Sequence, residues 1–139
     1  MKIRTWILVA AVTLCGAASA SAQLAPALEY AWSLNLQAFN KKDINALMAA
    51  IDSRSPDYEA TKTAAEAQFK ELNVTTELKD FKFIGHDDEF AVARVKTKTT
   101  GQPGSGFADN ITDAIVLFHQ ENGTWKIWSE EIVAVELIP

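Results

Sequence analysis

The hydrophobic residues between positions 28 and 72 recur every three or four residues, which is the spacing of helices that each bury one face. We predict three helices here. The first begins after Pro26, the second is capped by Asp43 and ends near residues 52–54, and the third has Ser55 as N-cap and Pro56 as first residue. Their predicted buried positions are Leu28, Trp32, Leu36 and Phe39, then Ile44, Leu47, Met48 and Ile51, then Tyr58, Ala65, Phe69 and Leu72.

From residue 74 the hydrophobic period falls to two, the period of a β-strand, and it stays at two to the C-terminus. Four strands are predicted, over residues 74–85, 90–100, 107–120 and 124–137. Turn-forming residues separate them: Asp87-Asp88, a glycine-rich segment at 101–106, and Asn122-Gly123, a pair that favours the positive φ angles of a tight hairpin.

This order of elements predicts an α+β fold, with three N-terminal helices packed on a strongly curved four-stranded antiparallel sheet. The helices would lie on the concave side, because both apolar surfaces are buried there. The sequence has no internal repeat, so residues 23–139 are predicted to form a single domain.

Residues 1–22 have the pattern of a secretory signal peptide: Lys2 and Arg4, then an apolar run over residues 6–18, then small residues up to Ala22. The run is shorter than the about 20 apolar residues that span a bilayer. We therefore predict cleavage after Ala22 and a periplasmic or secreted mature protein, with a signal of bacterial type. Lipid attachment at Cys15 is the alternative, although the preceding leucine stands where such signals have a small residue.

Cleavage would change the composition of the chain, and the mature composition is the one that bears on function. It would leave 117 of the 139 residues, with 11 of the 13 basic side chains, all 18 acidic ones and a net charge of −7. The single cysteine would be lost, which excludes thiol catalysis, disulfides and cysteine-ligated zinc. An acidic domain with no basic cluster beyond Lys41-Lys42 is not expected to bind nucleic acid, and no later segment is apolar enough to span a membrane.

Two segments carry a resemblance to a known superfamily. One is the apolar strand 114–119 with the hairpin turn and Trp125-Lys126-Ile127 that follow it, and the other is the step from Phe39 to Leu47 between the first two helices. With the order of elements, they resemble exported bacterial members of the nuclear-transport-factor-2-like superfamily, which includes SnoaL-like and ketosteroid-isomerase-like proteins with a cystatin-like cone.

The resemblance implies a pocket between helices and sheet, and often a homodimer through the outer face of the sheet. It includes no catalytic motif. Because the superfamily contains isomerases, dehydratases and epoxide hydrolases beside many non-catalytic members, the fold alone does not select a function.

Asp109 and Asp113 are the candidate general bases, four residues apart on the third predicted strand. They would face the same side about 13 Å apart, at ~3.3 Å per residue, which is too far to share a proton or one metal ion. Asp113 lies between two isoleucines, so desolvation there would raise its pKa toward that of a working base. The interpretation we favour is an ion pair with Arg94 or Lys96 on the neighbouring strand.

The two histidines lie in different settings. His86 begins the sequence His86-Asp87-Asp88-Glu89, which contains the ligand types of a cation site. Adjacent acids in a turn fan outward into water, however, so we expect a solvated turn and no metal site. His119 is a candidate hydrogen-bond donor, but no nucleophile elbow accompanies either histidine, which argues against triad hydrolysis.

The last strand supplies further candidates. By strict alternation one face carries Trp125, Ile127, Ser129 and Glu131, and the other carries Lys126, Trp128, Glu130 and Ile132. Each face has a tryptophan, so both are expected to be covered, which favours a homodimer. One of the consecutive residues Glu130 and Glu131 must face the cone, where it would be a candidate catalytic acid or a charged residue at the rim of the pocket. The predicted pocket residues are Tyr30, Trp32, Phe69, Trp128 and Glu130.

Two hypotheses remain. In the first, the protein is an exported non-catalytic homodimer whose cone is filled by side chains or binds a small apolar or amphipathic molecule. In the second, it is a cofactor-free isomerase, dehydratase or hydrolase with Asp113 or Asp109 as base and Tyr30 or His119 as hydrogen-bond donor. The strands contain no obligatory pair of catalytic polar residues, so we favour the first hypothesis.

Overall fold

The computed structural model describes residues 16–139, and the side chains of residues 22–139. The charged start and most of the apolar run of the predicted signal peptide lie outside these residues. The elements, in order, are α1 (Gly16–Asn40), α2 (Ile44–Ala49), α3 (Tyr58–Glu71), β1 (Val74–His86), β2 (Phe90–Gly101), β3 (Asn110–Glu121) and β4 (Thr124–Leu137).

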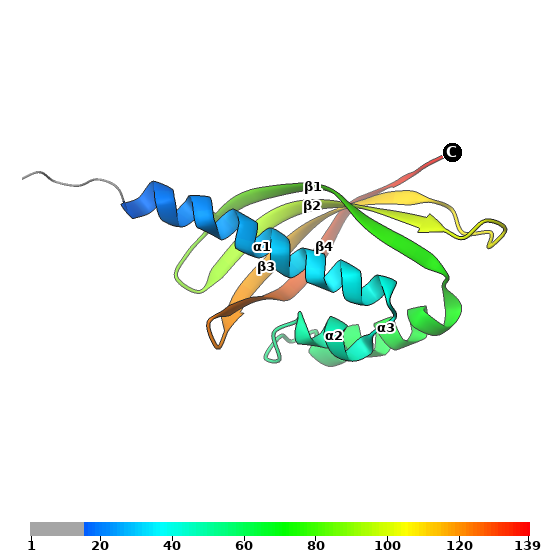
Figure 1. Cartoon of the computed structure of the whole chain (residues 1–139), viewed down its shortest axis with the longest axis horizontal. Helices are drawn as coiled ribbons and strands as arrows, with labels where there is room; N and C mark the ends of the chain where they lie inside the picture. The colour runs from blue at the N-terminus through cyan, green and yellow to red at the C-terminus, as the bar shows by residue number, and fades with distance from the viewer. Residues whose placement is uncertain (1–15) are drawn as a thin grey trace, which may run out of the picture.

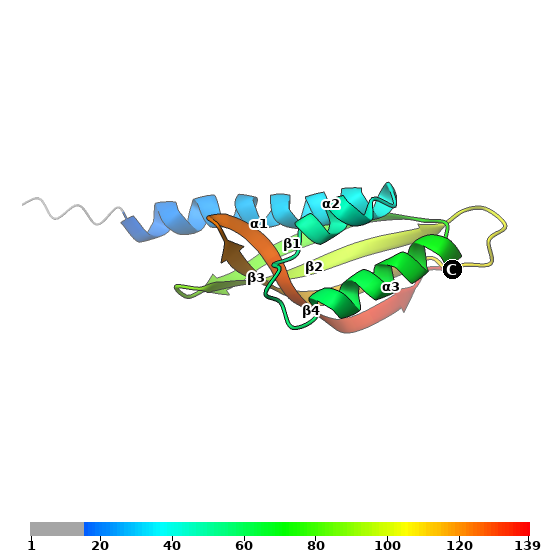
Figure 2. The same ribbon diagram turned by 90° about the horizontal axis from the view of Figure 1, so that it is seen from below.

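The predicted α+β fold is confirmed: three helices lie on a four-stranded antiparallel sheet in the order β1-β2-β3-β4. Figure 1 shows α1 lying along one face of the bent sheet, with α2 and α3 together below it, and Figure 2 shows the same arrangement turned by 90°. The turn between β3 and β4 has the predicted positive φ angles, 52° at Asn122 and 78° at Gly123. In the part of the chain that the structure describes, no helix combines the length and apolarity that crossing a membrane requires.

The core lies between the helices and the inner face of the sheet. The register pairs Ala93 with Val116 and Val95 with Ala114, so these four side chains share that face. The predicted helical positions Leu28, Trp32 and Leu36 are buried against it together with α2 and α3. The alanines on the two central strands, Ala91, Ala93 and Ala114, are buried in this core.

The helix boundaries differ from the prediction in three places. α1 is already formed at Gly16, the first described residue and ten residues before Pro26, because the intervening residues are mostly alanine and favour the helix, and a proline removes only one of its hydrogen bonds. α2 ends at Ala49, and Ile51 forms a parallel bridge with Ile127 in place of a last helical turn. α3 begins at Tyr58, with Asp57 at the N-cap position.

Polar residues at the end of α1 and the start of α2 have structural roles. Asn40 at the end of α1 accepts a hydrogen bond from the backbone N–H of Thr76 at 2.7 Å and donates to its carbonyl at 2.8 Å. The Lys42 ammonium group donates to the carbonyl of Phe69 at 3.0 Å. Asp43 caps α2 as predicted, accepting from the backbone of the third residue along.

Two bulges in β4 change which of its residues face the helices. β3 and β4 shift register twice, so that Trp128 and Val133 have no partner on β3. Phe118 pairs with Ile127 and Val116 pairs with Glu130, so Ile127 and Glu130 share the inner face. Strict alternation had put them on opposite faces, and that prediction is wrong because each bulge inserts one extra residue. β3 also begins at Asn110 and not at residue 107.

Candidate functional site

A cavity of about 460 Å³ opens between the helices and β4. Its apolar lining comes from all three helices, from the loop after α2 and from β4, and its polar lining lies mostly on α3 and β4. The lining residues are Trp32, Asn35, Phe39, Leu47, Ile51, Asp57, Ala60, Thr61, Ala64, Ala65, Gln68, Ile127, Trp128, Ser129 and Glu130.

Small side chains on α3 leave the space for this cavity. Ala60, Thr61, Ala64 and Ala65 recur at helical spacing along its inner side, and all four line the cavity. Larger residues there would fill the volume with side chains, as the core does under α1. α3 therefore has few large apolar residues, and its helical hydrophobic pattern in the sequence is weak. The small side chains that stand in their place leave the cavity open.

Glu130 is the ionisable residue that β4 contributes to the cavity. It lies two residues after the bulge at Trp128, which turns it to the same side as Ile127. The residue is exposed to solvent, while the surrounding protein atoms partly desolvate its carboxyl and raise its pKa above the ordinary value. Asp57, at the start of α3, is the second carboxylate of the lining.

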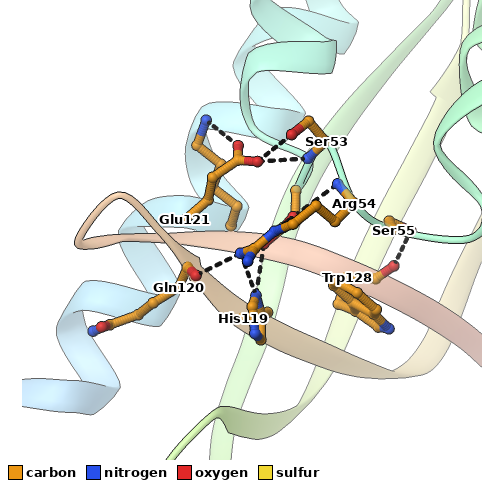
Figure 3. Close-up of polar contacts among 9 residues, drawn as sticks. Ser53, Arg54, Ser55, His119, Gln120, Glu121 and Trp128 are labelled. Carbon is orange, nitrogen blue, oxygen red and sulfur yellow. Dashed lines mark hydrogen bonds and ion pairs between the residues drawn. The ribbon is translucent and has the colours of Figure 1, made fainter.

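The loop after α2 carries an ionic cluster built on a buried carboxylate (Figure 3). Asp52 is fully buried. Its carboxylate accepts two hydrogen bonds from the Arg54 guanidinium, at 3.2 and 3.1 Å, and lies 2.7 Å from Nδ1 of His119 on β3. Desolvation would raise the pKa of Asp52, but the hydrogen bonds of Arg54 and His119 outweigh it and lower the pKa to about 2.

Further hydrogen bonds fasten the same loop to the hairpin of β3 and β4 (Figure 3). The Arg54 guanidinium donates to the carbonyl of Gln120 at 2.9 Å, and the Ser55 hydroxyl donates to the carbonyl of Trp128 at 2.6 Å. Glu121 accepts from the hydroxyl and backbone N–H of Ser53. Because Ile51 and Asp57 flank this loop and line the cavity, the cluster fixes part of the cavity wall.

Sequence reasoning missed Asp52 and Arg54. It treated residues 52–54 as the end of a helix, where an acid and a base two residues apart look like solvated loop residues. Their importance depends on His119, which is 67 residues from Asp52 in the chain. No local pattern in the sequence indicates that contact.

Three of the predicted pocket residues line the cavity: Trp32, Trp128 and Glu130. Tyr30 does not, because its side of α1 faces solvent and the residue is 65% exposed. Phe69 lies beside the cavity, edge-on to Phe39 with ring centroids 5.4 Å apart. His119 is held in the Asp52 cluster and is also absent from the lining.

Neither candidate aspartate reaches the cavity. Asp113 accepts two hydrogen bonds from the Arg94 guanidinium, at 2.8 and 2.7 Å, which lower its pKa. The expectation of a raised pKa at Asp113 is therefore wrong, and the predicted ion pair with Arg94 is present. Asp109 precedes β3 and accepts a hydrogen bond from the backbone N–H of Gly101 at 2.9 Å.

The acidic turn between β1 and β2 is shaped by its own hydrogen bonds. One oxygen of Asp87 accepts from the backbone N–H groups of Glu89 and Phe90, both at 2.8 Å. These bonds lower the pKa of Asp87. Within residues 22–139, no three His, Cys, Asp or Glu side chains gather closely enough to hold a metal ion.

Comparison with known families decides where the chain belongs. The sequence model described as the C-terminal domain of the anti-sigma-I factor RsgI9 matches residues 31–138. The chain belongs to this RsgI9 C-terminal domain family. The match covers the part of α1 after Tyr30, both other helices and the whole sheet, so the family pattern includes every element that lines the cavity. No curated protein matches the chain.

Solved structures show that this member of the RsgI9 C-terminal domain family has the nuclear-transport-factor-2-like fold. A variant of Rv3472 from Mycobacterium tuberculosis, a protein of unknown function, is 11% identical with a TM-score of 0.75, and the match covers 87% of this chain and 76% of that one. A nuclear-transport-factor-2-like protein of unknown function from Pseudomonas putida KT2440 is 13% identical with a TM-score of 0.68, covering 81% and 87%.

A ketosteroid isomerase-like protein from Erwinia carotovora atroseptica SCRI1043 is 16% identical with a TM-score of 0.59, covering 79% of this chain and 96% of that one. At these identities the likeness shows the fold alone. The predicted nuclear-transport-factor-2-like fold is confirmed, and the structural neighbours include proteins of unknown function and an isomerase-like protein. An activity cannot be transferred from the fold to members of the RsgI9 C-terminal domain family.

Proposed function

We propose that this protein is an exported, non-catalytic binding domain that holds a small molecule in the cavity between its helices and β4. The observation that carries the proposal is the cavity itself. Its volume of about 460 Å³ lies within the usual range of small-molecule sites, and its walls combine apolar residues with a few polar groups. A binding role also suits a family named after part of a regulatory protein, an anti-sigma factor.

A probe-binding experiment tests this proposal. The purified protein is titrated with the neutral naphthalene dye prodan, whose emission reports transfer into an apolar site. Ala64→Trp places a large ring in the cavity and should weaken dye binding about tenfold or more, because the ring takes the volume that the dye needs.

Ala67→Trp is the matched control, because Ala67 is an exposed residue on the same helix outside the lining. It should leave dye affinity unchanged. Equal affinities in the two variants would show that the dye binds elsewhere, and absence of dye binding to the unmodified protein would overturn the proposal. Extraction of natively purified protein, followed by mass spectrometry, would identify a molecule that the cavity already holds.

An enzyme is the second candidate function, and one observation favours it. Glu130 is a cavity carboxylate with a raised pKa, which is a property of general bases. In this alternative Glu130 replaces Asp113 and Asp109 as the base of a cofactor-free isomerase, dehydratase or hydrolase acting on a small apolar substrate. Conversion of a small apolar substrate that is lost in Glu130→Gln would support it; conversion that Glu130→Gln leaves unchanged would exclude Glu130 as the base.

We further propose that the protein forms a homodimer through the outer face of the sheet. Val92, Ile115 and Leu117 alternate with the buried residues of β2 and β3 and so lie on that face, where they are half-buried in a single chain.

We propose export on the basis of the signal-peptide pattern, with cleavage after Ala22. N-terminal sequencing of the mature protein should read Gln23 as its first residue, and an intact N-terminus would contradict export by this route.

A further inference from the structure

The charges in the cavity all have one sign. Among the described residues that line it, the two ionisable groups that can carry charge are Asp57 and Glu130, both carboxylic acids, and no lysine, arginine or histidine is present. The remaining polar residues of the lining, Asn35, Thr61, Gln68 and Ser129, are uncharged. A bound anion would meet two like charges without a compensating cation, so the lining selects against anions.

Three aromatic residues stand in the same lining: Trp32, Phe39 and Trp128. The face of an aromatic ring attracts a cation, and tryptophan does so most strongly. Carboxylates combined with tryptophans in a partly desolvated site are the groups that recognise an ammonium centre with apolar substituents. We propose that the cavity binds an organic cation, an amine or quaternary ammonium compound that also carries an apolar group.

An inorganic cation fits the lining less well. Hard metal ions take six or more oxygen ligands at short distance from one point, whereas this lining sets two carboxylates and four uncharged polar side chains among aromatic and aliphatic ones. The described side chains also include no group of three or more metal-ligating residues. An organic cation loses less hydration free energy than a metal ion when it enters the cavity, and its apolar group contacts the apolar walls. It would therefore interact with both the carboxylates and the apolar side chains of the lining.

The state of Glu130 supports this assignment. The one cause of its raised pKa is desolvation, so no neighbouring positive charge offsets its negative charge when it ionises. A ligand cation would provide that compensation. The net charge of −7 in the predicted mature chain would also attract cations toward the molecule.

Matched probes test the proposal, which rests on the proposed binding function. Benzyltrimethylammonium and its neutral carbon isostere neopentylbenzene have nearly the same shape and differ in charge, and phenylacetate supplies an anion. Each is used to displace prodan from the full chain. We expect the cation to displace the dye at a concentration about tenfold lower than the neutral isostere, and phenylacetate to be the weakest.

Glu130→Gln keeps the size of the side chain and removes its charge. It should reduce the affinity for benzyltrimethylammonium about tenfold and leave the affinity for neopentylbenzene unchanged. Glu131→Gln is the matched control, because Glu131 pairs with Ile115 and lies outside the lining. It should change neither affinity.

The outcomes separate the two proposals. If the neutral isostere or phenylacetate displaces the dye as well as the cation does, or if Glu130→Gln weakens both probes equally, the organic-cation proposal is wrong and the binding function stands. If prodan does not bind, or if Ala64→Trp does not affect its binding, the proposed cavity function itself is wrong.

Discussion

At the scale of single residues, the least expected feature is the fully buried Asp52. An ionised carboxylate is costly to bury unless it is paired and hydrogen-bonded, and Arg54 and His119 meet that condition. The contact between Asp52 and His119 joins the loop after α2 to β3, so it stabilises the tertiary structure. Asp113 and Arg94 make a comparable pair, but across two neighbouring strands on the outer face of the sheet.

Asp52 should make stability depend on acid pH. Its pKa is lowered in the folded protein from 3.8 to about 2, so its stabilising contribution is present above pH 4 and is lost as the pH falls toward 2. Asp52→Asn should lower the free energy of unfolding by about 2 kcal/mol at neutral pH and have a much smaller effect near pH 2.

Urea unfolding at several pH values measures this effect. Asp88→Asn, in the exposed turn between β1 and β2, is the control and should change stability little. A destabilisation by Asp52→Asn that stays constant between pH 7 and pH 2 would mean that packing, and not charge, is what the substitution removes.

At the scale of elements, turns and bulges set the geometry of the cavity. The bulge at Trp128 turns Glu130 inward, and the tight turn at Asn122-Gly123 fixes the register of the hairpin that carries both residues. The turn could be predicted because Asn-Gly favours positive φ locally. The bulges could not, because no turn-forming residue marks them in a strand that otherwise alternates.

Gly123 should be sensitive to substitution because its φ of 78° disfavours any side chain. Gly123→Ala should lower the free energy of unfolding by about 1 kcal/mol, although nothing lies within 4 Å of the added methyl group. Gly85→Ala is the control, since Gly85 also has open space around it but no positive φ. Thermal unfolding of the two variants gives the comparison, and equal stabilities would contradict a backbone cause.

At the scale of the whole molecule, the outer face of the sheet is the surface that a second copy would cover. Ile115 lies near its centre, beside Arg94 and Glu131 on the neighbouring strands. Apolar residues half-exposed on a broad sheet face are typical of an interface, and burying them would offset the entropy lost on association.

Sedimentation at tens of micromolar protein should therefore find a dimer. Ile115→Lys should produce monomers, because it would replace an apolar contact at the centre of the interface with a charge, and the cost of desolvating a buried charge can exceed what an ion pair returns. Leu34→Lys, at a leucine on α1 that is already 40% exposed and lies in the helical layer, is the control and should remain dimeric. A monomer in the unmodified protein would refute the dimer.

The sequence by itself determined the secondary structure, the order of the strands and the fold, because each depends on local periodicity, capping residues and short turns. It also predicted Trp128 and Glu130 of β4 as pocket residues, although not the bulge that puts Ile127 and Glu130 on the same face. The tertiary structure decided the site: bulges aim Glu130, small residues on α3 leave the volume, and Asp52 meets His119. These features depend on contacts between residues far apart in the chain, which local patterns do not encode.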